Sequence, residues 1–200
     1  MVYDNVRGSR KYGFNTLIPM DLKHLTIIDG DVKKSSRYEA VSFYMLEQLL
    51  GAFRKISAET SIVDLGCGKG RMMMVAPHFG FQNITGIDFA KEVCEQAIVN
   101  MKITEKKFPG ITWNVINQNV EDYNIASTDS VFFMFNPFES SVLKNFLENL
   151  NASCDQFPRT TYFIYASPQH EQLLLDNGYA IAYQKQKMYL KGIIAVRDKL

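Results

Sequence analysis

The chain shows no excess of one charge, few cysteines and no long hydrophobic run. Its 22 lysines and arginines offset 21 aspartates and glutamates, so composition gives no bias toward nucleic acid or membranes. The three cysteines, Cys67, Cys94 and Cys154, form no C-x-x-C pair and have no histidine at metal spacing, so we expect no metal site and no disulfide framework. No run approaches the ~18 apolar residues of a membrane span. These absences, with no signal-peptide core at the start, fit a cytoplasmic protein.

What is present indicates one globular domain with an N-terminal extension. Hydrophobic residues make up 46% of the 200 positions, enough for one substantial core. Residues 1–35 are polar and broken by glycine and proline, so they are expected to add little to that core. They are either a disordered tail or a lid, in which Tyr12 and Tyr38 cover a ligand. Residues 36–200 are expected to form the single domain, starting with an amphipathic helix over 36–54.

Residues 61–71 are the most informative stretch, reading Ser-Ile-Val-Asp-Leu-Gly-Cys-Gly-Lys-Gly-Arg. The short apolar run is typical of a buried parallel strand, and Asp64 comes where it ends. Alternating glycines then predict a turn with positive φ, which a ligand can approach without a Cβ in the way. The turn consists of Gly66, Cys67, Gly68, Lys69 and Gly70. Helix-favouring residues follow, so the unit predicts a ligand cradle with free N–H groups at a helix N-terminus.

A second short strand, 83–88, ends in a carboxylate. Asp88 at this position is placed to accept hydrogen bonds from both ribose hydroxyls of an adenosine. Phe89 follows it and is expected to lie against the adenine face. Alternating glycines also occur in nicotinamide-binding folds, where the usual spacing is G-x-G-x-x-G. A sheet of this kind with an unused glycine turn is the plain structural alternative.

Further strand and helix patterns alternate along the chain. Strands are expected near 113–116, over 130–135 and over 160–166; helices near 90–102, over 142–150 and between an N-cap at Ser167 and a stop at Gly178. Runs at 179–183 and 188–196 predict a hairpin that turns at 184–187. The alternation predicts an α/β fold, a mostly parallel sheet with helices on both faces. Lysines near 102–107 and 185–191 are interpreted as solvated surface.

The sequence Phe-Asn-Pro-Phe ends the 130–135 strand, at the edge where ligands bind in such sheets. Pro137 stops the strand and restricts Asn136 to extended geometry, which directs an amide and nearby carbonyls into the site. These acceptors suit the N–H groups of a neutral amine that attacks an activated methyl group. Phe138 is placed to flank a planar substrate or a cation. The alternative is a plain strand end with Phe138 in the core.

The motifs D-L-G-C-G-K-G and G-I-D-F closely resemble those of class I S-adenosylmethionine (SAM)-dependent methyltransferases. The motif F-N-P-F is similar to N-P-P-(Y/F) of amino-group methyltransferases but lacks the second proline, which speaks against DNA bases as acceptors. A wider likeness joins the chain to small bacterial members of unassigned substrate, with matches at Arg10, Lys11, Tyr12, Gly13, Thr16, Tyr38, Asp64 to Arg71 and Asn136 to Phe138.

This resemblance implies a Rossmann-like, seven-stranded sheet that ends in an antiparallel hairpin, and SAM as the cofactor. It implies cofactor contacts from Tyr38, Asp64, Gly66, Cys67, Gly68, Gly70, Asp88, Phe89, Asn119 and Val120, and catalytic roles for Asn136, Pro137 and Phe138. Gln118-Asn119-Val120 stands where the family more often has Gly-Asp-Ala, and the amide oxygen of Asn119 still suits adenine N6.

The sequence therefore predicts a methyltransferase that acts on a nitrogen of a protein, RNA or small-molecule acceptor, with no membrane partner. The alternatives are a non-catalytic SAM-fold module that binds a protein or RNA partner, and a nicotinamide-dependent oxidoreductase. The glycine spacing and the little chain left for a second domain speak against the oxidoreductase. The sequence leaves the acceptor and the oligomeric state open.

Overall fold

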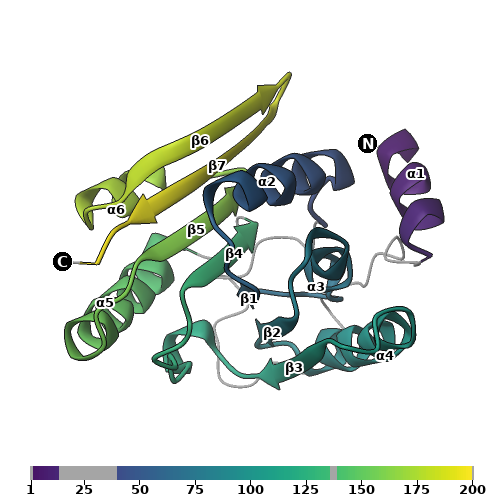
Figure 1. Ribbon diagram of the computed structural model, residues 1–200, viewed down its shortest axis with the longest axis horizontal. Helices are drawn as coiled ribbons and strands as arrows, with labels where there is room; N and C mark the ends of the chain where they lie inside the picture. The colour runs from purple at the N-terminus through teal and green to yellow at the C-terminus, as the bar shows by residue number, and fades with distance from the viewer. Residues whose placement is uncertain (1, 14–39, 136–138, 200) are drawn as a thin grey trace.

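A seven-stranded sheet runs through the centre of the computed structural model, which describes residues 2–13, 40–135 and 139–199 (Figure 1). The strands are β1 (Ser61–Leu65), β2 (Asn83–Asp88), β3 (Thr112–Asn117), β4 (Val131–Phe135), β5 (Thr161–Ala166), β6 (Ala180–Lys187) and β7 (Leu190–Arg197). Their order is β3-β2-β1-β4-β5-β7-β6, with β1 to β5 parallel and both pairings of β7 antiparallel. The predicted α/β sheet with a C-terminal antiparallel hairpin is confirmed.

Helices cover both faces of this sheet. They are α1 (Val2–Tyr12), α2 (Phe43–Ile56), α3 (Arg71–Val75), α4 (Lys91–Lys107), α5 (Ser140–Gln156) and α6 (Glu171–Asp176), with 3-10 turns η3 (Ala76–Phe79) and η4 (Val120–Asp122). Helices α2, α3 and α4 pack on one face, and α5 lies against the other face beside α6. No helix in the described ranges is long and apolar enough to cross a membrane.

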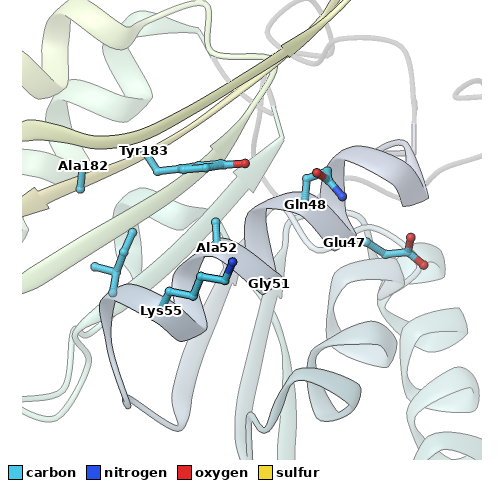
Figure 2. A pocket seen from close by; sticks show the side chains of 8 residues that line it. Glu47, Gln48, Gly51, Ala52, Lys55, Ala182 and Tyr183 are labelled. Carbon is cyan, nitrogen blue, oxygen red and sulfur yellow. The ribbon is translucent and has the colours of Figure 1, made fainter.

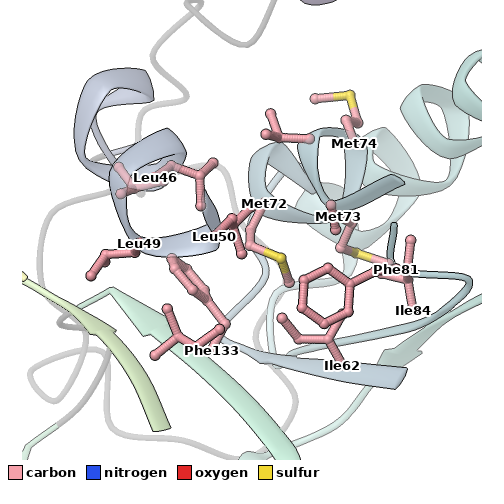
Figure 3. Close-up of a cluster of buried hydrophobic side chains, with 14 of the residues drawn as sticks. Leu46, Leu49, Leu50, Ile62, Met72, Met73, Met74, Phe81, Ile84 and Phe133 are labelled. Carbon is pink, nitrogen blue, oxygen red and sulfur yellow. The ribbon is translucent and has the colours of Figure 1, made fainter. Parts of the chain in front are cut away.

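Alternating strand residues build two cores, one on each face. On β4, Phe133 belongs to the cluster under α2 and α3, whereas Phe132 belongs to the cluster under α5. Figure 3 shows the first cluster, where Leu50 of α2 and Met72 of α3 meet Phe133. The continuous apolar run that predicted a central strand therefore reflects burial on both faces.

The N-terminal arm departs from the prediction. Residues 2–12 form a helix that packs against α2, and Tyr12 is only 1% exposed. The expectation that this stretch adds little to the core is therefore wrong for α1. Helix α2 itself begins at Phe43 rather than at 36, because Ser42 is its N-cap and accepts a hydrogen bond from the Met45 N–H.

Two expectations near the C-terminus are also wrong. Ser167 does not cap a helix: it has φ 51°, and α6 begins only at Glu171 after the N-cap His170. Residues 184–187 are not a turn but the end of β6, and the hairpin turns at Met188 and Tyr189. Both errors arise because polar residues were interpreted as turn or cap signals. Residues 184–187 are polar because β6 is an edge strand that is solvated on one side, and Ser167 is polar because it lies in a loop.

Candidate functional site

The glycine turn between β1 and α3 has the backbone that its sequence predicts. Gly66, Gly68 and Gly70 have φ of 79°, 52° and 77°, in the left-handed region that favours glycine. Gly70 is the N-cap of α3, which begins at Arg71. The turn therefore leads directly from the end of β1 into a helix N-terminus, as predicted.

Four N–H groups of this turn already donate hydrogen bonds within the protein, so the turn itself offers fewer free N–H groups than its sequence predicts. The Gly66 and Cys67 N–H groups both donate to the Ile87 carbonyl, at 2.9 Å each. The Gly70 N–H donates to the Cys67 carbonyl at 2.8 Å, and the Gly68 N–H donates to Asp88 Oδ2 at 2.9 Å. The turn is thus fixed against the end of β2, and its contribution to binding lies in shape and in the carboxylate that it holds.

Asp88 is the hydrogen-bonding centre of the site. Its side chain is held at both oxygens, because Oδ1 accepts from the Ala90 N–H at 3.0 Å and Oδ2 from Gly68. A carboxylate has about four lone-pair sites, so each oxygen keeps room for a further donor. Burial raises the pKa of Asp88, and the bonds from Ala90 and Gly68 oppose this only in part. This arrangement favours a ligand that brings two donors, such as a ribose diol.

Asp64 lies on the neighbouring strand and on the same face. Residues 62 and 64 alternate with 63, and the β1–β2 register sets Asp64 opposite Gly86, two residues before Asp88. Asp64 is 2% exposed, and its pKa is raised well above the usual range by burial and by the charge of Asp88. Two nearby buried carboxylates repel each other when both are ionised. A cationic ligand relieves this repulsion, so the pair fits a positively charged cofactor.

Cys67 fills the small space inside the turn. It is 6% exposed, and burial raises the pKa of its thiol well above the usual range, so it remains protonated. A Cβ on Gly86 of β2 would come within 2.9 Å of Cys67 Cβ and Sγ, and closer still to Met73 Sδ. Gly86 therefore lets the glycine turn and α3 approach β2. We did not predict this role, although a glycine within a strand is a signal of close approach.

The segment after β3 reaches the same edge of the sheet. The Gln118 N–H donates to the Asp88 carbonyl at 3.0 Å, as does Asn117 Nδ2. Asn119 is the next residue after Gln118 and so lies close to Asp88. The backbone carbonyl of Asn119 accepts a hydrogen bond from the Asp122 N–H at 3.1 Å. Val120 is 5% exposed and packs into the core under α5, and Phe89 is half-buried beside Asp88.

The remaining predicted site residues lie elsewhere or outside the described ranges. Tyr12 is stacked on Phe43, with ring centroids 5.5 Å apart, and its hydroxyl donates to Glu47 Oε1 at 2.7 Å. It belongs to the packing of α1 on α2, so its predicted contact with a ligand does not agree with this placement. Tyr38 lies outside the described residues.

The predicted catalytic residues Asn136, Pro137 and Phe138 also lie outside the described residues. The strand that precedes them is placed: Met134 of β4 pairs with Leu65 of β1. Strand β4 therefore ends beside the glycine turn. Among the described residues, no group of three or more His, Cys, Asp or Glu side chains could hold a metal ion.

Comparisons with known proteins agree with this geometry. Residues 62–155 match a family model described as a methyltransferase domain. No curated protein matches the chain. An RNA methyltransferase from Salinibacter ruber, solved with S-adenosylhomocysteine, has a TM-score of 0.59 at 15% identity, over 80% of this chain and 94% of that one.

Two further solved structures are of methyltransferases whose names give other kinds of acceptor. Magnesium protoporphyrin IX methyltransferase from Synechocystis PCC 6803, with bound SAM, has a TM-score of 0.55 at 14% identity, over 80% of this chain and 85% of that one. Ribosomal protein L11 methylase from Lactobacillus delbrueckii has a TM-score of 0.56 at 15% identity, over 78% and 80%. At these identities the likeness concerns the fold, and it does not distinguish between acceptors.

Proposed function

This chain belongs to the class I SAM-dependent methyltransferase family, and on that premise we propose that it methylates a nitrogen atom of a protein, RNA or small-molecule acceptor. The cofactor is SAM, which when bound supplies a methyl group activated by a sulfonium. The three cysteines are free thiols, which suits the cytoplasmic location that we also propose.

The arrangement of Asp88 against the glycine turn is the observation that carries the proposal. Asp88 is held by the Gly68 and Ala90 N–H groups and keeps lone pairs for two hydroxyl donors. We assign Asp88 to the ribose of SAM. Asp64 is assigned to the positive charge of SAM, because a buried carboxylate with a raised pKa gains most from a cation. Asn119 and Phe89 are assigned to the adenine, with Tyr38 completing the pocket.

The nitrogen acceptor is supported by the residues that follow β4. An activated methyl group needs a nucleophile held in line with the leaving group, so the main task of the protein is positioning. In this proposal Asn136 accepts an N–H of the acceptor amine through its amide oxygen. Pro137 holds Asn136 in extended geometry, and Phe138 flanks the acceptor. Strand β4 ends beside the glycine turn, so the residues after Phe135 start close to the cofactor.

Binding of S-adenosylhomocysteine tests the cofactor assignment. A ligand that binds only the folded protein stabilises it by about 2.7 kcal/mol at 100 times its Kd, which raises the melting temperature. We expect this shift with S-adenosylhomocysteine and none with NAD, measured by thermal unfolding and calorimetry. A folded protein that responds to neither ligand would contradict the cofactor assignment, and a response to NAD alone would favour the oxidoreductase.

The substitution Asn136→Ala tests the acceptor assignment. We expect it to preserve most of the affinity for S-adenosylhomocysteine and to lower transfer of a labelled methyl group to cell extract, with the product identified by mass spectrometry as an N-methyl group. Asn83→Ala, an exposed residue at the start of β2 and thus at the opposite edge of the sheet, is the matched control and should leave transfer unchanged. Equal transfer by the Asn136 variant, or a product methylated on oxygen or carbon, would contradict the proposal.

A further inference from the structure

The β6–β7 hairpin extends past the edge of the sheet at which the methyl-transfer site lies. Phe135 at the end of β4 pairs with Ala166 of β5, and Ala166 pairs with Gly192 of β7. Strand β7 begins two residues before Gly192, and Leu190 pairs with Lys187 of β6. The hairpin thus continues about 7 Å further, at about 3.3 Å per residue, before its turn. Figure 1 shows it reaching beyond β5.

The hairpin is basic without any acidic residue. Residues 180–197 contain Lys185, Lys187, Lys191 and Arg197 but no aspartate or glutamate. Lys191 forms an ion pair with Glu171. Among the described residues Lys185 and Lys187 form no ion pair, and Lys187 Nζ lies 4.3 Å from the centre of the Tyr44 ring on α2. Two cations therefore stand at the same edge of the sheet as the site, three strands away from β4, with no acid of the hairpin to neutralise them.

A groove of about 370 Å³ lies below the hairpin tip between α2 and β6, and it runs from the level of Tyr183 toward the edge at which the parallel strands begin. Figure 2 shows the ring of Tyr183 lying across it, with Lys55 on the facing helix. One carboxylate lines the groove within the described part of the chain, that of Glu47, and it is engaged by Arg7 and Lys11 at 2.8 and 2.9 Å. The groove therefore offers exposed positive charge beside an aromatic ring.

The tip of the hairpin is built from side chains that a turn does not favour. Met188 has φ 53°, which is uncommon for a residue other than glycine or asparagine, and a two-residue hairpin turn with positive φ at its first residue alone favours glycine there. Met188 is 81% exposed and Tyr189 is 68% exposed, so packing does not explain either. Backbone strain of this kind is found where side chains serve a function.

From these features we infer that the hairpin and the groove dock single-stranded RNA, the acceptor of the methyl group. Lysines beside a groove suit a phosphate backbone, and an exposed tyrosine suits stacking on an unpaired base. Unpaired bases are the usual target of proteins that recognise RNA. The inference rests on the proposed function, since it names the acceptor of that same site.

Two other roles for this surface explain fewer of its features than RNA binding does. They are protection of the sheet edge and binding of an acidic protein. Lysines on an edge strand prevent sheets from pairing edge to edge, which would explain Lys185 and Lys187. That role needs neither an exposed Met-Tyr turn nor a groove with Lys55. An acidic protein segment would satisfy the lysines, but it has no planar base to stack on Tyr189.

The inference is tested by the binding of a short, labelled single-stranded RNA of mixed sequence, measured by fluorescence anisotropy at several salt concentrations. Lys185→Gln with Lys187→Gln should weaken binding and lower its salt dependence by about 1.4, since each phosphate contact contributes about 0.7 to the logarithmic slope. Met188→Gly with Tyr189→Asn should weaken binding about tenfold, the effect of one lost stacked base. The second variant places a glycine at the position with positive φ, so its melting temperature should not fall.

The control carries the same charge change at a distance. Lys102→Gln with Lys106→Gln alters exposed residues of α4 near the opposite edge of the sheet and should leave RNA binding unchanged. All variants should bind S-adenosylhomocysteine as the wild type does, and loss of this binding in a hairpin variant would contradict a docking role.

If the protein bound no RNA, or if all variants bound RNA equally well, the inference would be overturned. Intact S-adenosylhomocysteine binding in the same experiment would still support the proposed cofactor assignment. Equal competition by DNA of the same sequence or by polyglutamate would also overturn the inference, in favour of DNA or an acidic protein.

Discussion

In the half of the sheet to which we assign the cofactor, β1 to β3, backbone N–H groups fix the glycine turn. In the half to which we assign the acceptor, β4 to β7, the hairpin offers side chains at its surface. We call these the cofactor half and the acceptor half. In the first half, the Gly66, Cys67 and Gly68 N–H groups all bond to the last two residues of β2. In the second half, the hairpin tip exposes Met188 and Tyr189. A site made by the backbone tolerates few sequences, so the cofactor half is easier to recognise than the acceptor half.

The two halves also differ in where their charged side chains lie. Asp64 and Asp88 are buried at the end of β1 and β2, where burial raises the pKa of both. The lysines of β6 stand at the surface, where water and salt screen them. A buried carboxylate affects binding strongly and at short range, whereas surface lysines attract a polyanion at longer range.

The largest expected effect comes from Asp88→Ala in the cofactor half. Removing a charged acceptor of ligand hydroxyls should weaken S-adenosylhomocysteine binding by about 1.5–3 kcal/mol. The Gly68 and Ala90 N–H groups lose their acceptor as well, so we also expect a lower stability. Calorimetry measures the first effect and urea unfolding the second.

Asp88→Asn serves as the control for this substitution, because its amide keeps one oxygen as an acceptor and should bind with intermediate affinity. RNA binding at the hairpin should stay near the wild-type level in both variants. Unchanged cofactor affinity in the alanine variant would mean that the ribose is held elsewhere.

Two glycines give a matched test of the comparison. A Cβ at Gly86 would meet Cys67 in the cofactor half, and a Cβ at Gly192 would meet Met45 and Leu49, at 2.7 and 2.9 Å, under α2. Overpacking of this kind costs about 1–3 kcal/mol, so both alanine variants should be less stable in urea unfolding. Only Gly86→Ala should weaken S-adenosylhomocysteine binding, because only Gly86 lies under the glycine turn.

If Gly192→Ala weakened cofactor binding as much as Gly86→Ala does, the two halves would be coupled through overall stability. A normal affinity in the Gly86 variant would show that the glycine turn does not depend on its close approach to β2.

The sequence allowed the strands of the sheet to be predicted because their signal is local. The run at 130–135 is apolar at every position after Ser130, and the structure buries it on both faces. The turn at 184–187 and the cap at Ser167 were predicted wrongly, because a polar edge strand and a polar loop have the same composition. Helix α1 was missed because its support comes from Glu47, which is 35 to 40 residues away along the chain.

The candidate site shows the same division. The positive φ of the glycines and the position of Asp88 followed from the motif itself. The bonds that occupy the turn N–H groups could not be predicted, because they depend on how β2 lies beside β1. Gly86 was visible in the sequence as a glycine within a strand, but its role became clear only from its distance to Cys67. The roles of Tyr38 and of residues 136–138 remain predictions.

Glu47 forms a third kind of charged site, outside both halves of the sheet. Its carboxylate accepts from Arg7 at 2.8 Å, Lys11 at 2.9 Å and Tyr12 at 2.7 Å, and so fastens α1 to α2. Burial raises the pKa of Glu47, but these three hydrogen bonds outweigh that effect and leave the pKa lowered. This is opposite to the raised pKa of Asp64 and Asp88.

The smallest of the expected effects follows from Glu47→Gln. Hydrogen bonds to a charged group contribute about 1.5–3 kcal/mol, but Arg7 and Lys11 are 37% and 51% exposed, so we expect a loss of about 1–2 kcal/mol in urea unfolding at pH 7. The folded-state pKa lies below the ordinary 4.5, so this stability is present above that pH and is lost as pH falls through the folded pKa. The difference between wild type and variant should therefore shrink below pH 4.5, whereas Glu148→Gln, which breaks an exposed pair with Lys144, should change little at any pH. Equal stability of wild type and variant at pH 7 would mean that α1 is held by the packing of Tyr12 on Phe43 and not by the carboxylate.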